Sequence, residues 1–446
     1  MDYDYIIIGG GICGVQIAAL CSTLGKALLL EKTKRLGGRA RVVEKDGFKL
    51  DYGPHPVRFG KKSAIANTLR DVGIKDVKFI DPGKMIVYLK SGERHIFPSG
   101  IMGYIKTKLI PRIKTIKTIW KLRKKVKKDP NNLFDVSFKE YFEKNDINPR
   151  IRLFLKLASS SMQVNPHMER SSIGEFYMNF IEVIKKRISV NYPQGGWNTF
   201  FTKLSNVIEA NGGIIQTESE VEKIIVEDGK AVGIKLNGKL IKAKNIVSTI
   251  PVQKLFTILD PNLAPKEFVE KCRNLRPTAG IAIDFCLSKQ ITDDNFMFFE
   301  DPPSFGIVPS NLTSEIAPEN KSIMSFFAPT YPSIIKDKER RQAYHDNFRA
   351  QILEIYPQIE KNIEFERNLF LKVVDGVEIA IDQYRGLRPM INDLKIPHLY
   401  LTGDSIGGTG AGGDVGHTSV RQCYDLIKEN IHSNIDKNSM KIRDRN

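Results

Sequence analysis

The stretch YIIIGGGICGVQIAALCSTLGKALLLE, from Tyr5 to Glu31, decides the fold of this chain. It opens with a β-branched run, passes through the glycine turn Gly9–Gly14 and closes with a second apolar run, Ala27–Glu31. Apolar residues at helical spacing between the two runs predict a helix that starts near Ile12. Strand, turn, helix and strand within about thirty residues match one βαβ unit. We therefore predict a parallel sheet covered by helices.

The glycines of this turn follow the pattern G-x-G-x-x-G, and each has a physical reason. Gly9 permits the sharp turn, Gly11 allows close approach of a pyrophosphate, and Gly14 allows the helix to pack on the strand. The free amides at the helix start would then bind phosphate. The predicted dinucleotide contacts here are Gly9, Gly11, Ile12, Cys13 and Gly14. A glycine turn without a ligand is the alternative.

Two side chains near the turn are also informative. Glu31 ends the second strand, where an acidic residue accepts hydrogen bonds from the adenosine ribose of a bound dinucleotide. A surface carboxylate at a strand end is the alternative. Cys13 lies inside the turn, where a thiolate would be repelled by a pyrophosphate, so we interpret it as a small packing residue.

Length and composition limit the classes of protein that are possible. The chain has 446 residues, which predicts two or three domains. Hydrophobic residues at 41% and charged residues at 27% exclude a collagen, a disordered chain and a polytopic membrane protein. Five scattered cysteines without a CxxC pair exclude a local disulfide framework or zinc knuckle, so we predict no metal and a reducing cytoplasm. Asp2 and Asp4 precede the first apolar stretch, so we expect no targeting segment.

A family resemblance begins at Glu31. The stretch EKTKRLGGRARVVEKDGFKLDYGPH, residues 31–55, resembles the N-terminal signature of the phytoene desaturase and flavin amine oxidase superfamily. The resemblance implies FAD as the cofactor, with R-x-G-G-R continuing the pyrophosphate site and D-x-G-P passing beside the isoalloxazine. The implied FAD contacts are Lys32, Arg35, Gly37, Gly38, Arg39, Gly53, Pro54 and His55.

Two later blocks extend this resemblance over most of the chain, from Asp2 to Ile427. The block YPQGGW, Tyr192–Trp197, is similar to a desaturase motif, and in these relatives the backbone at the position of Val221 pairs with adenine. Gly403-Asp404 resembles the C-terminal motif whose carboxylate holds the ribityl chain of FAD.

Six glycines between Gly407 and Gly416 precede a predicted helix that runs from about Asp414 to Ile431. Their exposed amides favour an anionic group, and a helix N-terminus would stabilise the negative charge of a reduced flavin. A flexible loop without a ligand is the alternative. The predicted flavin contacts from this segment are Gly412, Gly413, Asp414 and Val415.

The substrate is indicated less directly. His55 and His417 are the histidines that the motifs bring near a flavin, where either could hydrogen-bond flavin or substrate; a structural hydrogen bond is the alternative for each. Arg58 could bind an anionic substrate group or be a solvated surface residue.

The strand Gly280–Leu287 lacks the lysine that the amine oxidase branch usually carries, so the resemblance favours the desaturase branch. At the positions of His55 and Asp414, however, the desaturase motifs carry other residues. Whether the substrate is a carotenoid therefore stays open.

The stretch 105–128 holds eleven Lys or Arg residues and no acid, interleaved with apolar residues at helical spacing. It accounts for most of the net charge of +17. Such a helix could lie in an anionic headgroup layer, with Pro111 beginning or kinking it. Packing of the apolar side on the core, with solvated lysines, is the alternative. We expect no nucleic-acid partner, because no nucleic-acid motif accompanies the charge.

We predict an α/β fold: a Rossmann-like FAD-binding domain of the glutathione reductase or amine oxidase type with an inserted α+β substrate domain. The FAD domain is expected from 1–98, 191–255 and 385–432, a helical, basic insertion from 99–190, the substrate domain's sheet and helices from 256–384, and a frayed tail from 433–446. Asn237-Gly238 predicts a hairpin turn.

The hypothesis is a phytoene desaturase-like, FAD-dependent oxidoreductase that transfers hydride between an apolar lipid or isoprenoid and flavin N5, by desaturation or saturation. A flavin amine oxidase is the first alternative, and a non-catalytic prenyl-lipid carrier resembling GDP-dissociation inhibitors is the second. We expect a cytoplasmic protein, with peripheral attachment to the inner face of the cell membrane as an extension of this hypothesis.

Overall fold

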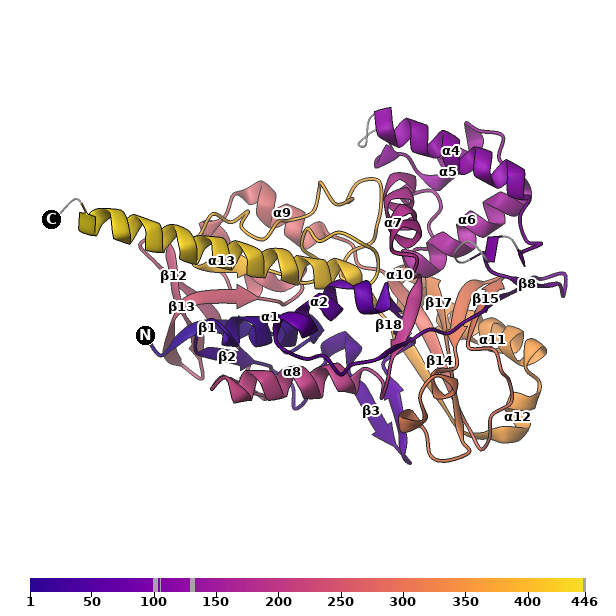
Figure 1. Ribbon diagram of the computed structural model, residues 1–446, viewed down its shortest axis with the longest axis horizontal. Coiled ribbons are helices and arrows are strands. Elements are labelled where there is room, and N and C mark those ends of the chain that lie inside the picture. The colour runs from indigo at the N-terminus through magenta and orange to yellow at the C-terminus, as the bar shows by residue number, and fades with distance from the viewer. Residues whose placement is uncertain (99–102, 105, 129–132, 444–446) are drawn as a thin grey trace.

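The computed structural model describes residues 1–98, 103–104, 106–128 and 133–443. A long first sheet lies toward both termini, and a second sheet with a group of helices above it forms the other end of the molecule (Figure 1). Residue 105, the first of the predicted basic stretch 105–128, lies outside the described residues, as do 99–102, 129–132 and 444–446.

The first sheet contains the predicted βαβ unit. β1 (Tyr3–Ile8), α1 (Ile12–Ser22) and β2 (Ala27–Leu30) follow one another, and β1 pairs in parallel with β2 and with β13 (Lys239–Ser248). The strand order is β10-β2-β1-β13-β12-β11, in which β10 spans Ile214–Gln216, and β19 (Leu399–Leu401) pairs in parallel with β13. The α/β fold class is confirmed, because the parallel strands come from the N-terminal, middle and C-terminal parts of the chain.

Three helices and a hairpin complete this domain. α1 packs against α8 (Asn198–Ala210) and α13 (Asp414–Arg443), both visible beside it in Figure 1. β11 (Lys223–Glu227), β12 (Lys230–Leu236) and β13 form an antiparallel meander. Asn237 and Gly238 turn between β12 and β13 with φ values of 49° and 76°, which confirms the predicted hairpin.

The second sheet has the order β18-β14-β17-β16-β15-β7-β8. Its later strands are β14 (Ala279–Leu287), β15 (Phe296–Glu300), β16 (Pro303–Ile307), β17 (Ser322–Thr330) and β18 (Ile363–Leu371). One face packs against α10 (Pro332–Lys336), α11 (Lys338–Ile355) and α12 (Gln358–Asn362), with Ile283, Phe299 and Phe326 in that core. The opposite face is turned toward α6 (Pro149–Met162). Alternation along each strand therefore divides its side chains between two cores.

Two predicted boundaries are wrong. β7 (Met85–Tyr88) and β8 (Arg94–Ile96) join the second sheet, because β7 pairs in parallel with β15, so the first FAD-domain segment ends before Met85 and not at residue 98. The tail is not frayed over its described part, since α13 continues to Arg443. No glycine or proline follows Gly416 to stop this helix.

The remaining elements are short or helical. β5 (Val57–Arg58), β6 (Phe79–Ile80) and β9 (Val190–Pro193) form a small sheet, and β3 (Val42–Lys45) pairs with β4 (Phe48–Asp51). The insertion carries α4 (Arg112–Lys128), α5 (Phe138–Glu143), α6 and α7 (Ile173–Lys186), as expected for a helical segment. The described residues also form α2 (Ala64–Asp71) and α9 (Lys266–Asn274). Among the described residues, none of the helices is long and apolar enough to cross a bilayer.

Candidate active site

A single continuous cavity of about 1910 Å³ joins the first sheet to the second. It begins at the glycine turn after β1, passes the loops that follow β4 and β19, and ends against the second sheet and the helical insertion. Sites for one small molecule occupy roughly 300–1,000 Å³, so this space accommodates a dinucleotide together with a second ligand.

The nucleotide end is formed by the turn before α1. Gly11 is the N-cap of α1, no side chain caps the helix, and its first turn carries no acid. A Cβ placed on Gly11 would have no atom within 4 Å, whereas a Cβ on Gly14 would lie 1.8 Å from the carbonyl oxygen of Gly9. Gly11 therefore faces open space and Gly14 is required for packing. Uncapped amides at the end of an open groove are suited to a pyrophosphate.

Glu31 lies at this end and is 8% exposed. Its Oε2 accepts a hydrogen bond from the Gly10 amide at 2.7 Å, and its Oε1 accepts from the amide and hydroxyl of Thr33 at 2.9 and 2.8 Å. A carboxylate has about four lone-pair sites, so one remains for a ribose hydroxyl. The residues present at this end of the cavity fit the nucleotide part of FAD.

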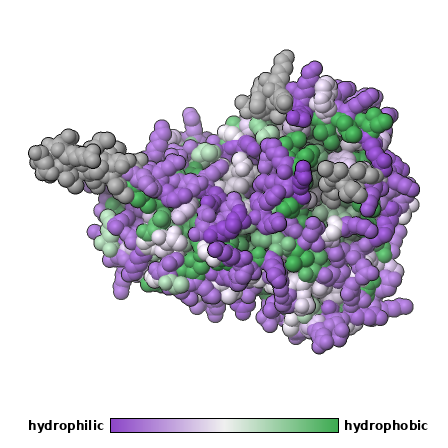
Figure 2. Space-filling model, in the orientation of Figure 1, coloured by the Kyte–Doolittle hydropathy of each residue, from purple (hydrophilic) through white to green (hydrophobic). Residues whose placement is uncertain are grey.

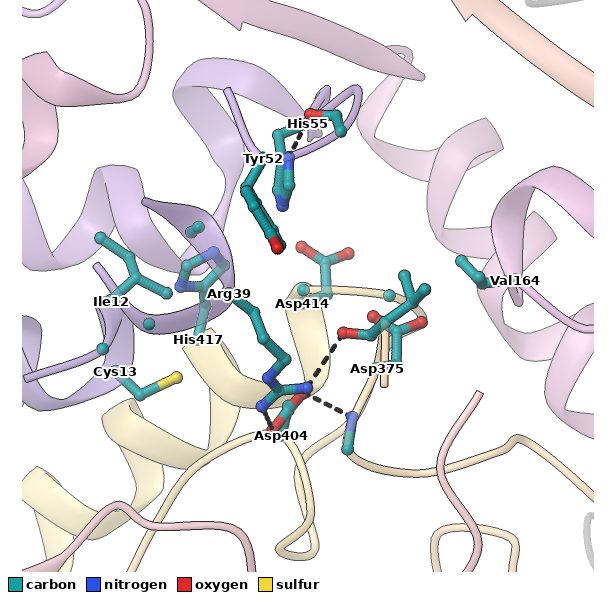
Figure 3. A pocket seen from close by; sticks show the side chains of 18 of the residues that line it. Ile12, Cys13, Arg39, Tyr52, His55, Val164, Asp375, Asp404, Asp414 and His417 are labelled. Carbon is teal, nitrogen blue, oxygen red and sulfur yellow. Dashed lines mark hydrogen bonds and ion pairs between the residues drawn. The ribbon is translucent and has the colours of Figure 1, made fainter. Parts of the chain in front are cut away.

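Arg39 and Asp404 lie opposite one another in the middle of the cavity wall (Figure 3). The guanidinium donates to both carboxylate oxygens at 2.6 Å, and the Gly376 amide donates to Oδ2 at 2.7 Å. Burial opposes ionisation of Asp404, but Arg39 outweighs it and holds the pKa of the carboxyl below its usual range. Both residues are predicted FAD contacts, and the structure brings them together as a pair that fixes the loop after β19 beside the loop at Gly376.

Asp375 lies next to this pair and escaped the sequence analysis, because no motif marks it. It lines the cavity, and Figure 3 shows its carboxylate beside Asp404 and Arg39. Burial, reinforced by the negative charge of Asp404, raises the pKa of Asp375 to about 7. Asp375 therefore holds a proton over much of the neutral range.

This shift makes the stability of the FAD-free protein depend on pH. The pKa of Asp375 rises from 3.8 to about 7 on folding, so the native state binds more protons between these values and the free energy of unfolding falls as pH rises through them. Asp375→Asn removes this loss. Denaturant unfolding should show a variant that is close to the wild type near pH 4 and about 4 kcal/mol more stable at pH 8. A difference that does not change with pH would contradict this assignment.

His417 projects from the first turns of α13, and its hydrogen bonds define its tautomer. Gln16 Nε2 donates to the Ile12 carbonyl at 3.1 Å and lies 2.8 Å from Nδ1 of His417. Because that nitrogen of Gln16 is a donor, Nδ1 must accept and the proton of the neutral ring is on Nε2. Burial lowers the pKa of His417 to about 4, although Asp404 opposes the shift. At neutral pH the residue is a hydrogen-bond donor at Nε2.

His55 and His417 both lie near the ring of Trp197. The centroid of the Trp197 ring lies 5.3 Å from that of His55 and 6.2 Å from that of His417. Nδ1 of His55 lies 2.6 Å from the Gly53 carbonyl oxygen, to which it donates, and burial lowers the pKa of His55. The structure thus brings the two predicted histidines into one wall as neutral rings.

The far end of the cavity is apolar. Phe296 and Phe298 on β15 point to the same face, and Phe97 stacks on Phe298 with ring centroids 4.2 Å apart. The residues that this face contributes to the cavity are Phe296, Phe298, Phe305, Phe327 and Leu371. The sequence analysis missed them. The alternating aromatic residues at 296 and 298 are the signal that could have indicated one of these strands.

The predicted FAD contacts line the cavity with one exception. Val415 is 2% exposed and belongs to the core of the first domain, because the first turn of α13 directs its side chain inward. Cys13 lies beside Gly416, and burial raises the pKa of its thiol to about 12, as expected of a packing residue. The residues in the cavity wall are Gly9, Gly11, Ile12, Cys13, Gly14, Glu31, Lys32, Arg35, Gly37, Gly38, Arg39, Gly53, Pro54, His55, Val221, Gly403, Asp404, Gly412, Gly413, Asp414 and His417.

The pattern of a known family, flavin-containing amine oxidoreductase, matches residues 25–417. The chain belongs to this family. Membership confirms the expected superfamily and FAD as its cofactor, and it favours an oxidoreductase over the carrier alternative. The matched range includes Glu31, the Arg39–Asp404 pair and His417, while the glycine turn Gly9–Gly14 at the nucleotide end of the cavity precedes it.

Several similar proteins have names that describe enzymes acting on carotenoids. The chain is 28% identical to prolycopene isomerase of Daucus carota over 73% of its length, and it spans 61% of that relative. It is 22% identical to 4,4'-diapolycopen-4-al dehydrogenase of Metabacillus indicus over 90% of this chain and 92% of that one. A solved oxidoreductase from Methanosarcina mazei superposes with a TM-score of 0.77 at 19% identity, covering 94% of this chain and 99% of that chain, which shows the shared fold.

Proposed function

We propose that this flavin oxidoreductase is phytoene desaturase-like and transfers hydride equivalents between FAD and an apolar, isoprenoid-type lipid. The observation that carries the proposal is the continuity of one cavity from the nucleotide groove at Gly11 to the phenylalanine wall at Phe298. Bound FAD supplies the hydride acceptor or donor. The carotenoid-acting relatives support the same substrate class.

The protein's own residues perform three tasks in this proposal. The turn at Gly11, Glu31 and the Arg39–Asp404 pair hold the cofactor. Nε2 of His417 is available to donate a hydrogen bond to an anionic group at the N-terminal end of α13, where a negative charge is favoured. The aromatic wall of the second sheet excludes water and orients an apolar chain by contact area rather than by polar anchors.

Anaerobic titration of the FAD-loaded protein tests this proposal. Phytoene or a related polyene in detergent should bleach the visible flavin band, or, for the reverse reaction, the reduced flavin should be reoxidised by the unsaturated partner. Bleaching by primary amines or polyamines, with no response to lipids, would establish the amine oxidase alternative. A colourless protein that cannot be reconstituted with FAD would support the carrier.

The basic helix α4 supports the additional proposal that the protein works at an anionic membrane surface. Ile113, Ile116 and Trp120 are 71, 64 and 60% exposed on α4, while Leu122 is buried. The apolar residues are therefore divided: some anchor the helix on the core and others face outward among lysines. Figure 2 shows apolar residues among polar ones at the upper right, where α4 lies in Figure 1.

The position of α4 relative to the cavity links this surface to the substrate. Ile116 and Ile119 of α4 line the cavity, as does Ile184 of α7, which is 49% exposed. An apolar ligand leaving a bilayer beneath α4 would meet the cavity wall without crossing water. Lys114, Lys117 and Lys121 would each contribute about 1 kcal/mol at an anionic surface.

Vesicle sedimentation checks this additional proposal. The wild type should bind phosphatidylserine-containing vesicles and not pure phosphatidylcholine vesicles, and Ile113→Ser/Trp120→Ser should weaken binding about tenfold or more because exposed apolar area is lost. Ile214→Ser/Leu240→Ser removes two apolar residues that are 40 and 44% exposed on the other domain and is the control. Equal loss in both variants, or binding that ignores lipid charge, would contradict the assignment.

A further inference from the structure

A buried ion pair interrupts the apolar wall of the cavity. Arg58 of β5 and Asp414 of α13 approach to 3.0 Å between Nη1 and Oδ2, and their side chains are 10 and 5% exposed. Both residues line the cavity, and Figure 3 shows the carboxylate of Asp414 pointing into the open space. Charged groups with so little contact with water are costly unless hydrogen bonds satisfy them.

The protein satisfies this pair only in part. Nη1 of Arg58 has contacts at 3.3 Å with Asn179 Oδ1 and 3.4 Å with the Ala411 carbonyl, and Nη2 lies 3.4 Å from Met162 sulfur and 3.5 Å from the Asn179 carbonyl. The three contacts to oxygen are longer than the usual 2.7–3.2 Å of an N–H···O hydrogen bond, and the thioether sulfur of Met162 is a weak acceptor. Oδ2 of Asp414 is buried and has no hydrogen bond with favourable geometry.

The Arg58–Asp414 pair is surrounded mainly by apolar side chains. Met162, Phe180 and Val183 line the cavity around the residues that contact Arg58. Burial raises the pKa of Asp414 to about 6 despite the positive charge of Arg58, which reflects the same poor solvation. A pure hydrocarbon placed here would remove the remaining water and offer no replacement hydrogen bonds.

We infer that the Arg58–Asp414 pair recognises an uncharged oxygen function, a hydroxyl or aldehyde, at one end of an otherwise apolar chain. This inference deepens the proposed function and rests on it. An aldehyde oxygen accepts from the Arg58 guanidinium, and a hydroxyl can also donate to Asp414. A carboxylate is disfavoured, because the charge of Arg58 is already balanced by Asp414 and a second anion would face that carboxylate.

The energetic consequence is discrimination between ligands rather than strong binding. A site built to hydrogen-bond an oxygen rejects the analogue that lacks it, because the buried partners are then left unpaired. Hydrogen bonds to charged groups are worth about 1.5–3 kcal/mol, which corresponds to roughly 10- to 100-fold in affinity. The pair is a specificity-determining site, and it requires no proton or electron transfer of its own.

The experiment compares matched ligands on the FAD-loaded protein. The probes are geranylgeraniol, the hydrocarbon of the same skeleton with hydrogen in place of the hydroxyl, and geranylgeranoic acid, each titrated while the flavin spectrum is followed. The wild type should bind the alcohol at least tenfold more tightly than the other two. Equal affinity for alcohol and hydrocarbon, or tightest binding of the acid, would overturn the inference.

Variants separate recognition from a structural role. Arg58→Met/Asp414→Leu replaces both charges by apolar groups, which avoids leaving one charge buried and unpaired. Compared with the wild type when both are saturated with added FAD, this variant should bind alcohol and hydrocarbon with similar affinity. Phe298→Leu, in the aromatic wall, is the control and should weaken both ligands alike. A preference for the alcohol that persists in the double variant would overturn the inference.

The outcome also distinguishes this inference from the proposed function. Binding of the hydrocarbon with no preference for the alcohol would leave the proposed function standing and remove only the role of the pair. If none of the three probes perturbs the flavin of the wild type, the apolar substrate itself is wrong, and both proposals fail together.

Discussion

Gly11→Glu should give a folded protein that no longer retains FAD. The added side chain would project into open space at the start of α1, where no atom lies within 4 Å of the new Cβ, so the fold has no reason to change. Its carboxylate would occupy the position expected for the pyrophosphate and would repel it. We expect the affinity for FAD to fall by a factor of about 100 or more, or about 3 kcal/mol. Titration of the apoprotein with FAD measures this directly.

Gly14→Ala provides the contrasting control for that experiment. A Cβ at this position would lie 1.8 Å from the Gly9 carbonyl oxygen, so α1 could not pack on the turn. This variant should lose thermal stability as well as FAD. If Gly11→Glu bound FAD like the wild type, the groove described above would not be the cofactor site.

Asp404→Ala should lose both FAD and stability, for two separable reasons. The substitution removes the acceptor of two hydrogen bonds from Arg39 and of one from the Gly376 amide. The Arg39 side chain is 35% exposed, so leaving it without its carboxylate costs less than for a fully buried charge, about 1–2 kcal/mol in the free energy of unfolding. The loop after β19 would also lose its connection to Arg39. Denaturant unfolding and flavin content of the purified protein measure the two effects.

The double variant Arg39→Met/Asp404→Leu isolates the cofactor contribution. Removing both charges should restore most of the stability, because no charge is left unpaired, while FAD binding stays lost. A single variant that unfolds normally and keeps its flavin would show that the carboxylate contacts neither Arg39 nor the cofactor in solution. FAD binding by the double variant at wild-type affinity would also contradict this assignment.

The βαβ unit could be predicted from the chain alone because its signals are local. Gly9 has a φ of 103°, Gly14 packs against the Gly9 carbonyl, and Gly11 leaves the groove open, and Glu31 follows at the end of the next strand. The hairpin at Asn237-Gly238 is local in the same way, since its backbone conformation is encoded by two residues. The family resemblance then indicated Arg39 and Asp404, which no local pattern connects.

Predictions failed where a strand or helix packs against a segment that is distant in the sequence. β7 shows no local preference for the second sheet, yet it pairs with β15, more than two hundred residues away in the chain. α4 looked like a single apolar face, but packing buries Leu122 and leaves Trp120 outside. Val415 was placed in the cavity by its neighbours in sequence, whereas the helical turn directs it into the core.

By itself the sequence determined the parallel βαβ core, the glycine groove for a dinucleotide and the family, because each depends on residues close together in the chain or on motifs of fixed spacing. Only the tertiary structure decided that Asp375 lies beside Asp404, that Trp197 lies near two histidines, and that Arg58 meets Asp414 in an apolar wall. These groups lie on separate elements. Their pKa values and hydrogen bonds arise from burial and proximity, which exist only once the two sheets have come together around the cavity.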